Sequence, residues 1–288
     1  MVLWNNFIRI SVSKIEVIPG ISTIGIKLLY PCTEYHQALF GCYRFKMNLS
    51  LGYLQKILFI NSSNYEKSTQ NLMKHLIKPG MTILDIGANI GFFTLFMAKL
   101  IHKEGKIYCF EPHPTNFQLL LDNIKSNDLK NVYPVNLALS NVTGKQQLSL
   151  NFFNDGGHSL GNLSNNLEVS KINPSVDKIL VNTCTIDEFI AKNHIEKVDF
   201  IKIDVEGAEY WVFEGAKKLL SQSNAPDIIC EIGNTAAIQI GKKESDIREL
   251  LYSFGYRSFF IEDGIREFGD EIPVTRLQNI LFTKSEIK

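Results

Sequence analysis

Short apolar, β-branched runs alternate with amphipathic stretches along the chain from residue 78 onward. The runs predict strands, and the stretches between them have the 3.6-residue apolar period of helices. The predicted strands span residues 82–86, 106–110, 132–139, 200–205, 228–232, 257–261 and 279–283. The predicted helices span residues 65–77, 92–101, 115–125, 208–221 and 245–254. Strands that are apolar on both faces and alternate with helices predict an α/β, doubly wound, mostly parallel sheet.

Two regions depart from this alternation. Residues 145–153 alternate polar and apolar positions, a segment rich in Gly, Asn and Ser follows, and residues 178–184 have the pattern of a second strand. We interpret residues 145–184 as an insertion that carries a β-hairpin and a long loop, of the kind that usually forms a lid or a binding loop. Residues 1–60 lack the alternation of predicted strands and helices, and we expect an N-terminal extension that packs on a core domain of residues 61–288.

Composition narrows the class of protein. The chain has 45% hydrophobic residues and as many Lys and Arg as Asp and Glu, 30 of each. A nucleic-acid partner is therefore not expected, since such proteins carry a basic footprint. Five cysteines without a CxxC pair favour a reducing cytoplasm and argue against a zinc site. The first residues lack the apolar core of a signal peptide, and no apolar run is long enough for a membrane span.

The stretch MTILDIGANIGFFTL places an acid and several small residues directly after the first predicted strand. The candidate binding residues of this turn are Asp85, Gly87, Ala88, Asn89 and Gly91. Small residues at the carboxyl end of a parallel strand let a ligand approach the backbone. The G-x-G-x-x-G spacing of a dinucleotide loop fails, because Asn89 and Phe92 occupy the second and third glycine positions. The carboxylate of Asp85 suits an ammonium group better than a phosphate.

The second and third predicted strands also end in candidate binding residues. Glu111 follows the second strand, where a carboxylate can accept hydrogen bonds from both hydroxyl groups of an adenosine ribose. Ala138 and Leu139 close the third strand and are expected to form a wall against an adenine ring.

The fourth strand and the turn after it, DFIKIDVEGAE, carry the candidate catalytic groups. Lys202 and Asp204 share one face of the strand and need partners if they are buried. Asp204 and Glu206 are predicted to orient or deprotonate an acceptor, and Glu231 ends the fifth strand at the same edge. The alternative is a structural network of Lys202 and carboxylates that caps the next helix, and for Glu209 the two interpretations are balanced. The spacing of these acids does not support a metal site.

Three further local predictions concern the insertion and its flanks. His158 is expected to reach over the site from the insertion and to assist catalysis. Thr185 and Glu188 form a capping box that predicts the start of a short helix. Trp211 and Phe213 are expected in the core.

Five strings together resemble the FkbM family of S-adenosylmethionine-dependent methyltransferases. They are LDIGANIGFFTL, FEPHPTNFQLLLDNI, ALSNVTGKQQL, TIDEF and IKIDVEGAEYWVFEGAKKLL, and the resemblance covers residues 65–256. It implies a class I, Rossmann-like fold with a seven-stranded sheet whose last strand is antiparallel, and O-methylation of a hydroxyl group. By this resemblance Asp85, Gly87, Asn89 and Gly91 hold the methionine part of the cofactor, Glu111 holds the ribose, and Asp204 and Glu206 lie near the acceptor. His113 departs from the family, which often has asparagine there.

The sequence thus predicts an S-adenosylmethionine-dependent O-methyltransferase. Its acceptor is expected to be a small molecule or carbohydrate: a sugar, a glycan or a secondary metabolite. Two alternatives stay open at this point. One is a NAD-dependent oxidoreductase on a Rossmann fold, which the missing third glycine disfavours, and the other is a protein that binds the cofactor without catalysis. The identity of the acceptor and the oligomeric state are not predicted.

Overall fold

A computed structural model describes residues 65–151, 157–163, 176–262, 264–269, 271–274 and 276–287 of the chain. Within residues 1–60 it describes two short strands, β1 (Leu39–Phe40) and β2 (Tyr43–Arg44), which pair antiparallel. The rest of the predicted N-terminal extension lies outside the described residues, so its packing on the core stays a prediction.

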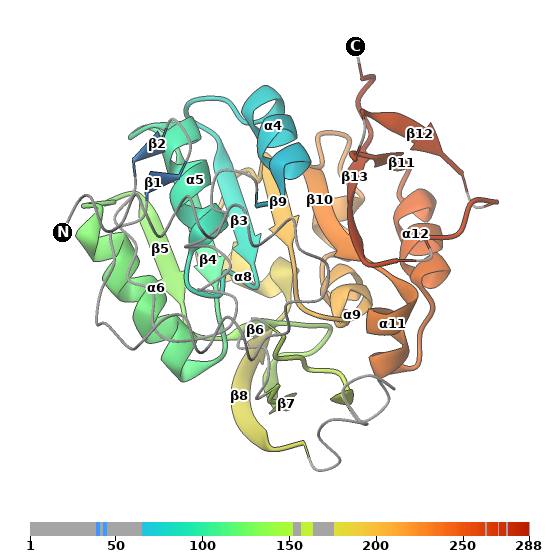
Figure 1. Cartoon of the computed structure of the whole chain (residues 1–288), viewed down its shortest axis with the longest axis horizontal. Coiled ribbons are helices and arrows are strands. Elements are labelled where there is room, and N and C mark those ends of the chain that lie inside the picture. The colour runs from blue at the N-terminus through green and yellow to red at the C-terminus, as the bar shows by residue number, and fades with distance from the viewer. Residues whose placement is uncertain are drawn as a thin grey trace, which may run out of the picture.

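The central sheet has the strand order β12-β11-β13-β10-β9-β3-β4-β5 in the described part of the chain (Figure 1). The strands are β3 (Thr82–Ile86), β4 (Lys106–Phe110), β5 (Val132–Val135), β9 (Phe200–Ile203), β10 (Asp227–Ile232), β11 (Arg257–Phe260), β12 (Arg266–Phe268) and β13 (Gln278–Thr283). Strands β5, β4, β3, β9 and β10 run parallel, and β13 is antiparallel to both β10 and β11. The predicted α/β sheet with an antiparallel last strand is confirmed. The short strand β12 adds an eighth strand at one edge, which the sequence pattern did not predict.

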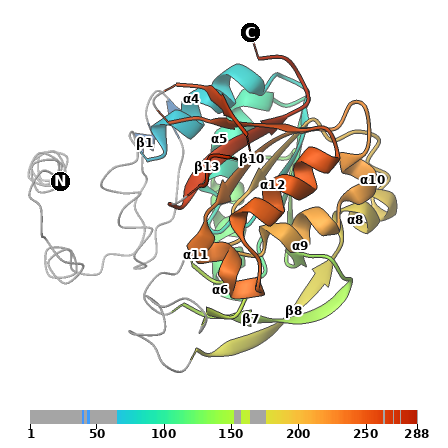
Figure 2. The ribbon, with the colours of Figure 1, turned by 90° about the vertical axis from the view of Figure 1, so that its right-hand side faces the viewer.

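Helices cover both faces of this sheet (Figure 2). They are α4 (Lys67–Leu76), α5 (Phe92–Ile101) and α6 (Pro114–Ser126) on one face, and α8 (Ile186–Lys192), α9 (Glu209–Glu214), α10 (Lys217–Leu220), α11 (Asn234–Ala237) and α12 (Glu244–Ser253) on the other. Successive strand residues point to opposite faces, so that Ile83 of β3 packs in the first apolar core and Leu84 in the second. Two cores on one sheet explain why the central strands are apolar throughout.

The helix predicted over residues 208–221 is interrupted at Gly215, between α9 and α10. A Cβ atom at Gly215 would lie 2.1 Å from the carbonyl oxygen of Ser140. The interruption between α9 and α10 therefore coincides with the close approach of the backbone at Ser140. The apolar period of the sequence does not reveal this contact.

The capping box predicted at the start of α8 is present in an altered form. The Oγ1 atom of Thr185 accepts a hydrogen bond from the backbone N–H of Glu188 at 3.1 Å, as expected. The second hydrogen bond of the box, from the N–H of Thr185 to the Glu188 carboxylate, is replaced by two bonds through Thr143. The N–H of Thr185 donates to Thr143 Oγ1 at 3.2 Å, and that hydroxyl donates to the Glu188 carboxylate. The box thereby ties the helix to the loop before β7 (Gly144–Ser149).

The third predicted strand is wrong in its second half. Strand β5 ends at Val135, and β6 (Ala138–Leu139) belongs to a different sheet. The N–H of Leu137 donates to the carbonyl of Val135 at 3.0 Å, and the side chain of Asn136 donates to the carbonyl of Glu111 at 2.9 Å. These bonds fix a tight turn, so the chain leaves the central sheet although its apolar pattern continues.

The second sheet contains β6, β8 (Lys178–Cys184) and β7, with β7 and β8 antiparallel. The two strands of the hairpin predicted for the insertion are therefore confirmed. Figures 1 and 2 show this sheet beyond the carboxyl ends of the central strands. The residue boundaries assigned to the extension, core domain and insertion stay predictions.

Among the described residues, no helix combines the length and the hydrophobicity that crossing a bilayer requires.

We expect a large difference between two alanine substitutions at glycines with the same backbone geometry. Gly87 has φ +82°, and a Cβ atom there would lie 1.8 Å from the carbonyl oxygen of Asp204, whereas Gly80 has φ +85° and no atom near the same position. Gly80→Ala should lower the free energy of unfolding by about 1 kcal/mol through backbone strain alone. Gly87→Ala should lower it by about 3 kcal/mol or more, because a strand end must also move. Urea denaturation measures both values, and equal losses would show that the contact with Asp204 is unimportant.

Candidate active site

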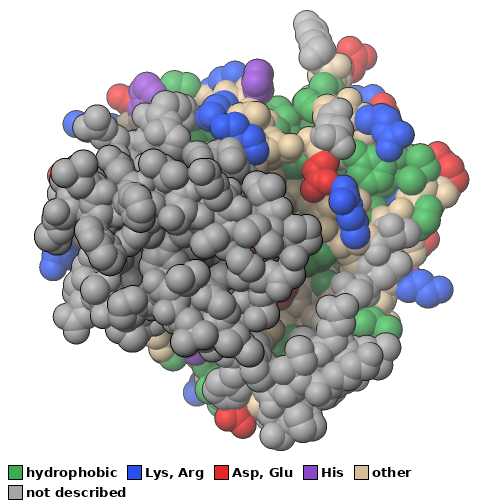
Figure 3. Space-filling model, in the orientation of Figure 1, with side chains coloured by type: hydrophobic (Ala, Val, Ile, Leu, Met, Phe, Trp, Pro, Cys, Tyr) green, Lys and Arg blue, Asp and Glu red, His purple; other side chains and the backbone are tan. Residues whose placement is uncertain are grey.

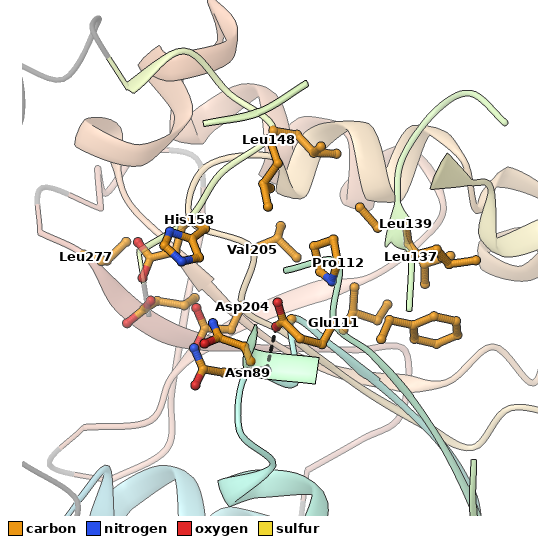
Figure 4. A pocket seen from close by; sticks show the side chains of 18 of the residues that line it. Asn89, Glu111, Pro112, Leu137, Leu139, Leu148, His158, Asp204, Val205 and Leu277 are labelled. Carbon is orange, nitrogen blue, oxygen red and sulfur yellow. Dashed lines mark hydrogen bonds between the residues drawn. The ribbon is translucent and has the colours of Figure 1, made fainter. Parts of the chain in front are cut away.

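One cavity lies at the carboxyl edge of the central sheet, where β3, β4 and β9 end side by side. Its described lining brings together Gly87 and Asn89 after β3, Glu111 after β4, and Asp204 and Glu206 after β9, with Ala138, Leu139 and His158 from the second sheet and the loop beside it. In Figure 4, Asn89, Glu111 and Asp204 lie on one side of the cavity, and Leu148 and His158 lie across from them. Most of the candidate residues predicted from separate stretches of sequence therefore meet in one place.

The turn after β3 is held by its own backbone. The N–H groups of Gly87 and Ala88 donate to the carbonyl of Phe110 at 3.0 and 2.9 Å. Gly91 has φ +93° and caps the start of α5, and a Cβ atom there would lie 2.6 Å from Leu120. Gly87 is thus required by close packing and also lines the cavity, Ala88 lines a smaller neighbouring cavity, and Gly91 is required by packing against Leu120 and lines neither cavity.

Asp85 does not line this cavity but lies beneath it, buried in the protein. It is 2% exposed, accepts a hydrogen bond from Thr94 Oγ1, and lines a smaller neighbouring cavity that also contains Lys202 and Asp204. Burial raises the pKa of Asp85 to about 6, although Thr94 and Lys202 favour its ionised form. Its assignment to an ammonium group therefore stays a prediction, with the side chain already engaged by Thr94.

Glu111 is buried, at 5% exposure, and points into the cavity (Figure 4). Its Oε2 atom accepts the N–H of Asn89 at 2.9 Å, and Oε1 accepts the N–H of His113 at 2.8 Å. Burial raises the pKa of Glu111 to about 7, while the two N–H groups favour its ionised form. Each carboxylate oxygen keeps a second lone pair, so both can still accept a hydroxyl group from a ligand.

The apolar wall of the cavity combines both sheets. Phe110 comes from the end of β4, Leu139 from β6 and Leu148 from β7, with Leu137 between the sheets. Ala138 and Leu139 line the cavity as predicted, but from the second sheet rather than from the end of a central strand. An aromatic ring system fits such a wall.

The acids at the ends of β9 and β10 form a cluster. Asp204, Glu206 and Glu231 each have a carboxylate oxygen within 4.8 Å of the others. Lys202, at 1% exposure, supplies a positive charge, with Nζ 3.4 Å from Oδ2 of Asp204 and over the ring of Phe93. Carboxylates at this spacing can share a proton, hold a hydroxyl group or bind a cation. The predicted pair of Lys202 and Asp204 is present.

Burial and mutual repulsion make this cluster hard to ionise fully. Burial, and after it Asp204 and Glu209, raise the pKa of Glu206 to about 8. Burial and Asp204 also raise the pKa of Glu231 well above its usual range. Burial by itself would lower the pKa of Lys202, but Asp204 and the other surrounding carboxylates raise it above its usual range. The lysine therefore stays charged, whereas the carboxyl groups of Glu206 and Glu231 are harder to ionise than usual.

The turn that carries Glu206 has an unusual backbone. Glu206 has φ +56° and Gly207 has φ +109°. A Cβ atom at Gly207 would lie 2.4 Å from the carbonyl oxygen of Ala236, and Oε1 of buried Glu209 accepts the N–H of Gly207 at 3.0 Å. Glu209 thus stabilises the turn through Oε1, which agrees with the structural one of the two interpretations that its sequence position allowed.

His158 reaches the cavity from the insertion. Its Nδ1 atom accepts the backbone N–H of Asn151 at 3.0 Å, and its ring lies 4.3 Å from that of His113. Burial, and then His113, lower the pKa of His158 to about 4. A neutral ring whose Nδ1 accepts a hydrogen bond carries its proton on Nε2. This atom is then a donor, which is opposite to the function of a base.

Several lining residues had no signal in the sequence. Tyr65 and Glu66 precede α4, Asn116 lies on α6, and Leu277 precedes β13. Asn116 lies in one of the strings that resemble the family but was not singled out, and the other three come from stretches without a chemical motif. A charged residue in a predicted helix, such as Glu66, is too common to be singled out.

The fold and the cavity together define a class I, Rossmann-like arrangement of the methyltransferase kind, with ligand groups at the carboxyl edge of a sheet whose last strand is antiparallel. Residues 85–258 match the family model described as the methyltransferase FkbM domain. The chain belongs to this family, for which use of S-adenosylmethionine is implied.

Over the aligned segments, three named relatives are 24–28% identical to this chain. Methyltransferase 1 of Beauveria bassiana is 27% identical over 143 residues, which cover 46% of this chain and 57% of that protein. The 2-O-methyltransferase NoeI of Sinorhizobium fredii is 28% identical over 183 residues, covering 59% and 74%. The hexuronic acid methyltransferase AglP of Haloferax volcanii is 24% identical over 199 residues, covering 69% and 72%. A solved methyltransferase FkbM from Methylobacillus flagellatus matches at a TM-score of 0.44 with 15% identity, covering 81% and 55%.

We expect Glu111→Gln to weaken the binding of S-adenosylhomocysteine about ten- to 150-fold, because each hydrogen bond to a charged acceptor contributes about 1.5–3 kcal/mol. Isothermal titration calorimetry measures the affinity, and the exposed Glu104→Gln variant is the matched control. The thermal transition of each variant shows that it is folded. An unchanged affinity in folded Glu111→Gln would remove Glu111 from the binding site.

Proposed function

We propose that this chain is an S-adenosylmethionine-dependent O-methyltransferase that acts on a hydroxyl group of a sugar, a glycan or a secondary metabolite. Membership of the FkbM family supports the reaction. The names of two relatives, a 2-O-methyltransferase and a hexuronic acid methyltransferase, support a carbohydrate hydroxyl as one acceptor. The observation that carries the proposal is a single cavity with a carboxylate for a ribose at one point and an acidic cluster at another.

The described residues fit the proposed cofactor. Glu111 offers an acceptor to each hydroxyl of a ribose, and Phe110, Leu137 and Leu139 offer an apolar wall to an adenine. The turn at Gly87 leaves no side chain between the backbone and the cavity. The acids near Lys202 provide negative charge for the ammonium group of an amino acid moiety, with Asp85 the predicted partner.

Asp204 is the proposed proton acceptor. When bound, S-adenosylmethionine supplies a methyl group whose bond to sulfur breaks as a bond to the acceptor oxygen forms. The proton of the acceptor hydroxyl passes to the Asp204 carboxylate, which Lys202 holds in place. Positioning of the reactants contributes about 7–11 kcal/mol in favourable cases, and a general base about 10²–10⁴-fold in rate, so orientation is the larger effect.

His158 is proposed to orient the acceptor through its Nε2–H group. The bond from Asn151 to Nδ1 fixes the ring, and the ring lines the cavity. A fixed donor opposite an acid cluster can hold an acceptor oxygen while the acid takes the proton. The proposed function of His158 is therefore substrate positioning rather than proton abstraction.

A nucleic acid is not proposed as a partner. On the face shown in Figure 3, the visible Lys and Arg side chains lie in several separate places rather than in one patch. This is consistent with the equal numbers of basic and acidic residues in the sequence.

We expect the chain to bind S-adenosylhomocysteine in calorimetry and not to bind NADH under the same conditions. Incubation with S-adenosylmethionine and a panel of free saccharides should add one methyl group to at least one of them, which mass spectrometry detects. Binding of NADH alone would favour the oxidoreductase alternative. Binding of S-adenosylhomocysteine without transfer to any saccharide or metabolite of a broad panel would favour a cofactor-binding protein without catalysis.

We expect the single-turnover rate of methyl transfer to rise with pH up to about 8 and then to level. The charged groups around Glu206 are Asp204, Glu209, Glu231 and Lys202. Since the pKa of Glu206 is raised to about 8, it is protonated at lower pH and becomes negative as the pH rises through that value. The new negative charge lies within the acidic cluster and favours transfer of the acceptor's proton to that cluster.

Two variants separate the functions of these acids. Glu206→Gln should remove the rise near pH 8 and keep most of the rate, whereas Asp204→Asn should lower the rate by about 10²–10⁴-fold at all pH values. The exposed Asp128→Asn variant is the control. A loss below about tenfold in Asp204→Asn would exclude proton abstraction by Asp204.

A further inference from the structure

A second groove lies between the three-stranded sheet and the helices that follow β9 and β10. Its described lining includes Gln146 of β7, Lys178 of β8, Trp211 of α9 and Gln239 of the 3-10 helix η2 (Ile238–Ile240). None of these side chains lines the cavity described above. We call this feature the amide groove.

Two amide oxygens in the amide groove are buried without a hydrogen-bond donor. Gln239 is 5% exposed, and its Oε1 atom accepts no hydrogen bond from the described residues. The Oε1 atom of Gln146, on strand β7, likewise accepts no hydrogen bond within the described part of the chain. An unpaired buried acceptor is unfavourable. A rotation of each glutamine side chain toward the groove would expose its oxygen to the hydroxyl donors of a ligand and so satisfy both acceptors.

The backbone around Gln239 is fixed. The N–H of Asn162 donates to the carbonyl of Gln239 at 2.9 Å, and Ser149 Oγ donates to the carbonyl of Gly161 at 2.8 Å. A Cβ atom at Gly161 would lie 2.7 Å from the Cβ of Gln239, so only glycine permits this packing. The groove therefore has a preformed floor, which lowers the entropic cost of binding.

Trp211 gives the groove an apolar face. The sequence predicted both Trp211 and Phe213 in the core, and Phe213 is fully buried, but Trp211 is half-buried and lines the groove. The prediction for Trp211 is therefore wrong. A large aromatic ring next to amide groups matches a ligand that has an apolar C–H face and hydroxyl groups at its rim. A sugar ring has this composition.

The amide groove adjoins the active-site cavity. Leu160 lines both of them. A Cβ atom at Gly207, the residue after Glu206, would lie 3.3 Å from the Cδ atom of Gln239. The side chain of Gln239 thus packs on the turn that carries the acidic cluster, and a ligand in the groove lies next to the proposed acceptor site.

We infer that the amide groove is a saccharide-binding subsite, in which an oligosaccharide acceptor places the sugar unit next to the one that is methylated. This inference rests on the proposed function, because it assumes that the acceptor is a carbohydrate. The sugar ring stacks on Trp211, and its hydroxyl groups donate to Gln239 and Gln146. The enzyme then prefers oligosaccharides over the corresponding free monosaccharides.

The charge of the groove favours a neutral saccharide over a nucleic acid. Lys178 is the one cationic side chain among the described residues of its lining, and it is exposed. Recognition of a nucleic-acid backbone normally uses several cations. The two buried amide oxygens also need several donors from one compact ligand, and sugar hydroxyls supply these more densely than the backbone of an extended peptide.

The test uses the whole chain saturated with S-adenosylhomocysteine on an array of neutral oligosaccharides. The strongest ligand is then titrated in solution, followed by the fluorescence of Trp211 in a Trp4→Phe background, since the chain has two tryptophans. Binding should change the fluorescence, and Gln239→Met should weaken the affinity by about tenfold, the effect of one good hydrogen bond. Gln118→Met, at an exposed glutamine of α6, is the matched control and should bind as the wild type does.

A stability measurement separates binding from a structural effect. Because Gln239→Met keeps the size of the side chain and removes an unpaired buried amide oxygen, its thermal transition should be no lower than that of the wild type. A lowered transition together with weaker binding would make Gln239 a structural residue and overturn its place in the subsite. Binding of S-adenosylhomocysteine without any array oligosaccharide overturns the subsite and leaves the proposed function intact. Failure to bind S-adenosylhomocysteine refutes the proposed function itself.

Discussion

The ammonium group of Lys202 is the interaction on which the acidic edge of the sheet depends. It is almost completely buried on the central strand β9, with Asp204 at 3.4 Å and the ring of Phe93 beneath it. Unpaired carboxylates at this density repel each other and would be protonated. One buried cation keeps part of the cluster ionised, and in return the carboxylates keep the lysine charged despite its burial. Removing either side would leave an uncompensated buried charge, which is among the costlier defects a core can carry.

Close backbone packing fixes the geometry around this pair. The turn after β3 touches the carbonyl of Asp204 at Gly87, and Asn89 of the same turn donates to Glu111 on the next strand. Three strand ends are thereby held relative to one another by contacts that tolerate little change. Two unfavourable local features lie near these strand ends: the positive φ of Glu206 and the unpaired Oε1 atom of Gln239. Such departures concentrate where a protein binds or reacts, because the surrounding structure sustains their cost.

The fold was largely readable from local patterns. Strands buried on both faces need continuous apolar runs, and the runs at β3 and β4 coincide with the predicted ones. The errors came from contacts between distant segments. The third strand ends early because Asn136 bonds to the carbonyl of Glu111, and the break at Gly215 in the helix after β9 accompanies the close approach of Ser140. The apolar pattern of the sequence continues through the end of the third strand and through Gly215, so it does not predict either contact.

The site divides in the same way. The sequence alone determined the glycine turn, Glu111 and the pair of Lys202 and Asp204, because each follows or ends an apolar strand and parallel strands bring their carboxyl ends to one edge. The sequence also placed Glu231 at this edge, but only the tertiary structure decided that its carboxylate lies within 4.8 Å of those of Asp204 and Glu206, and that Trp211 lines a groove instead of the core. It also decided that His158 presents a donor, since the bond from Asn151 selects the protonated nitrogen. Strand direction is encoded locally, whereas the exposure of a side chain and the tautomer of a ring depend on neighbours that only folding supplies.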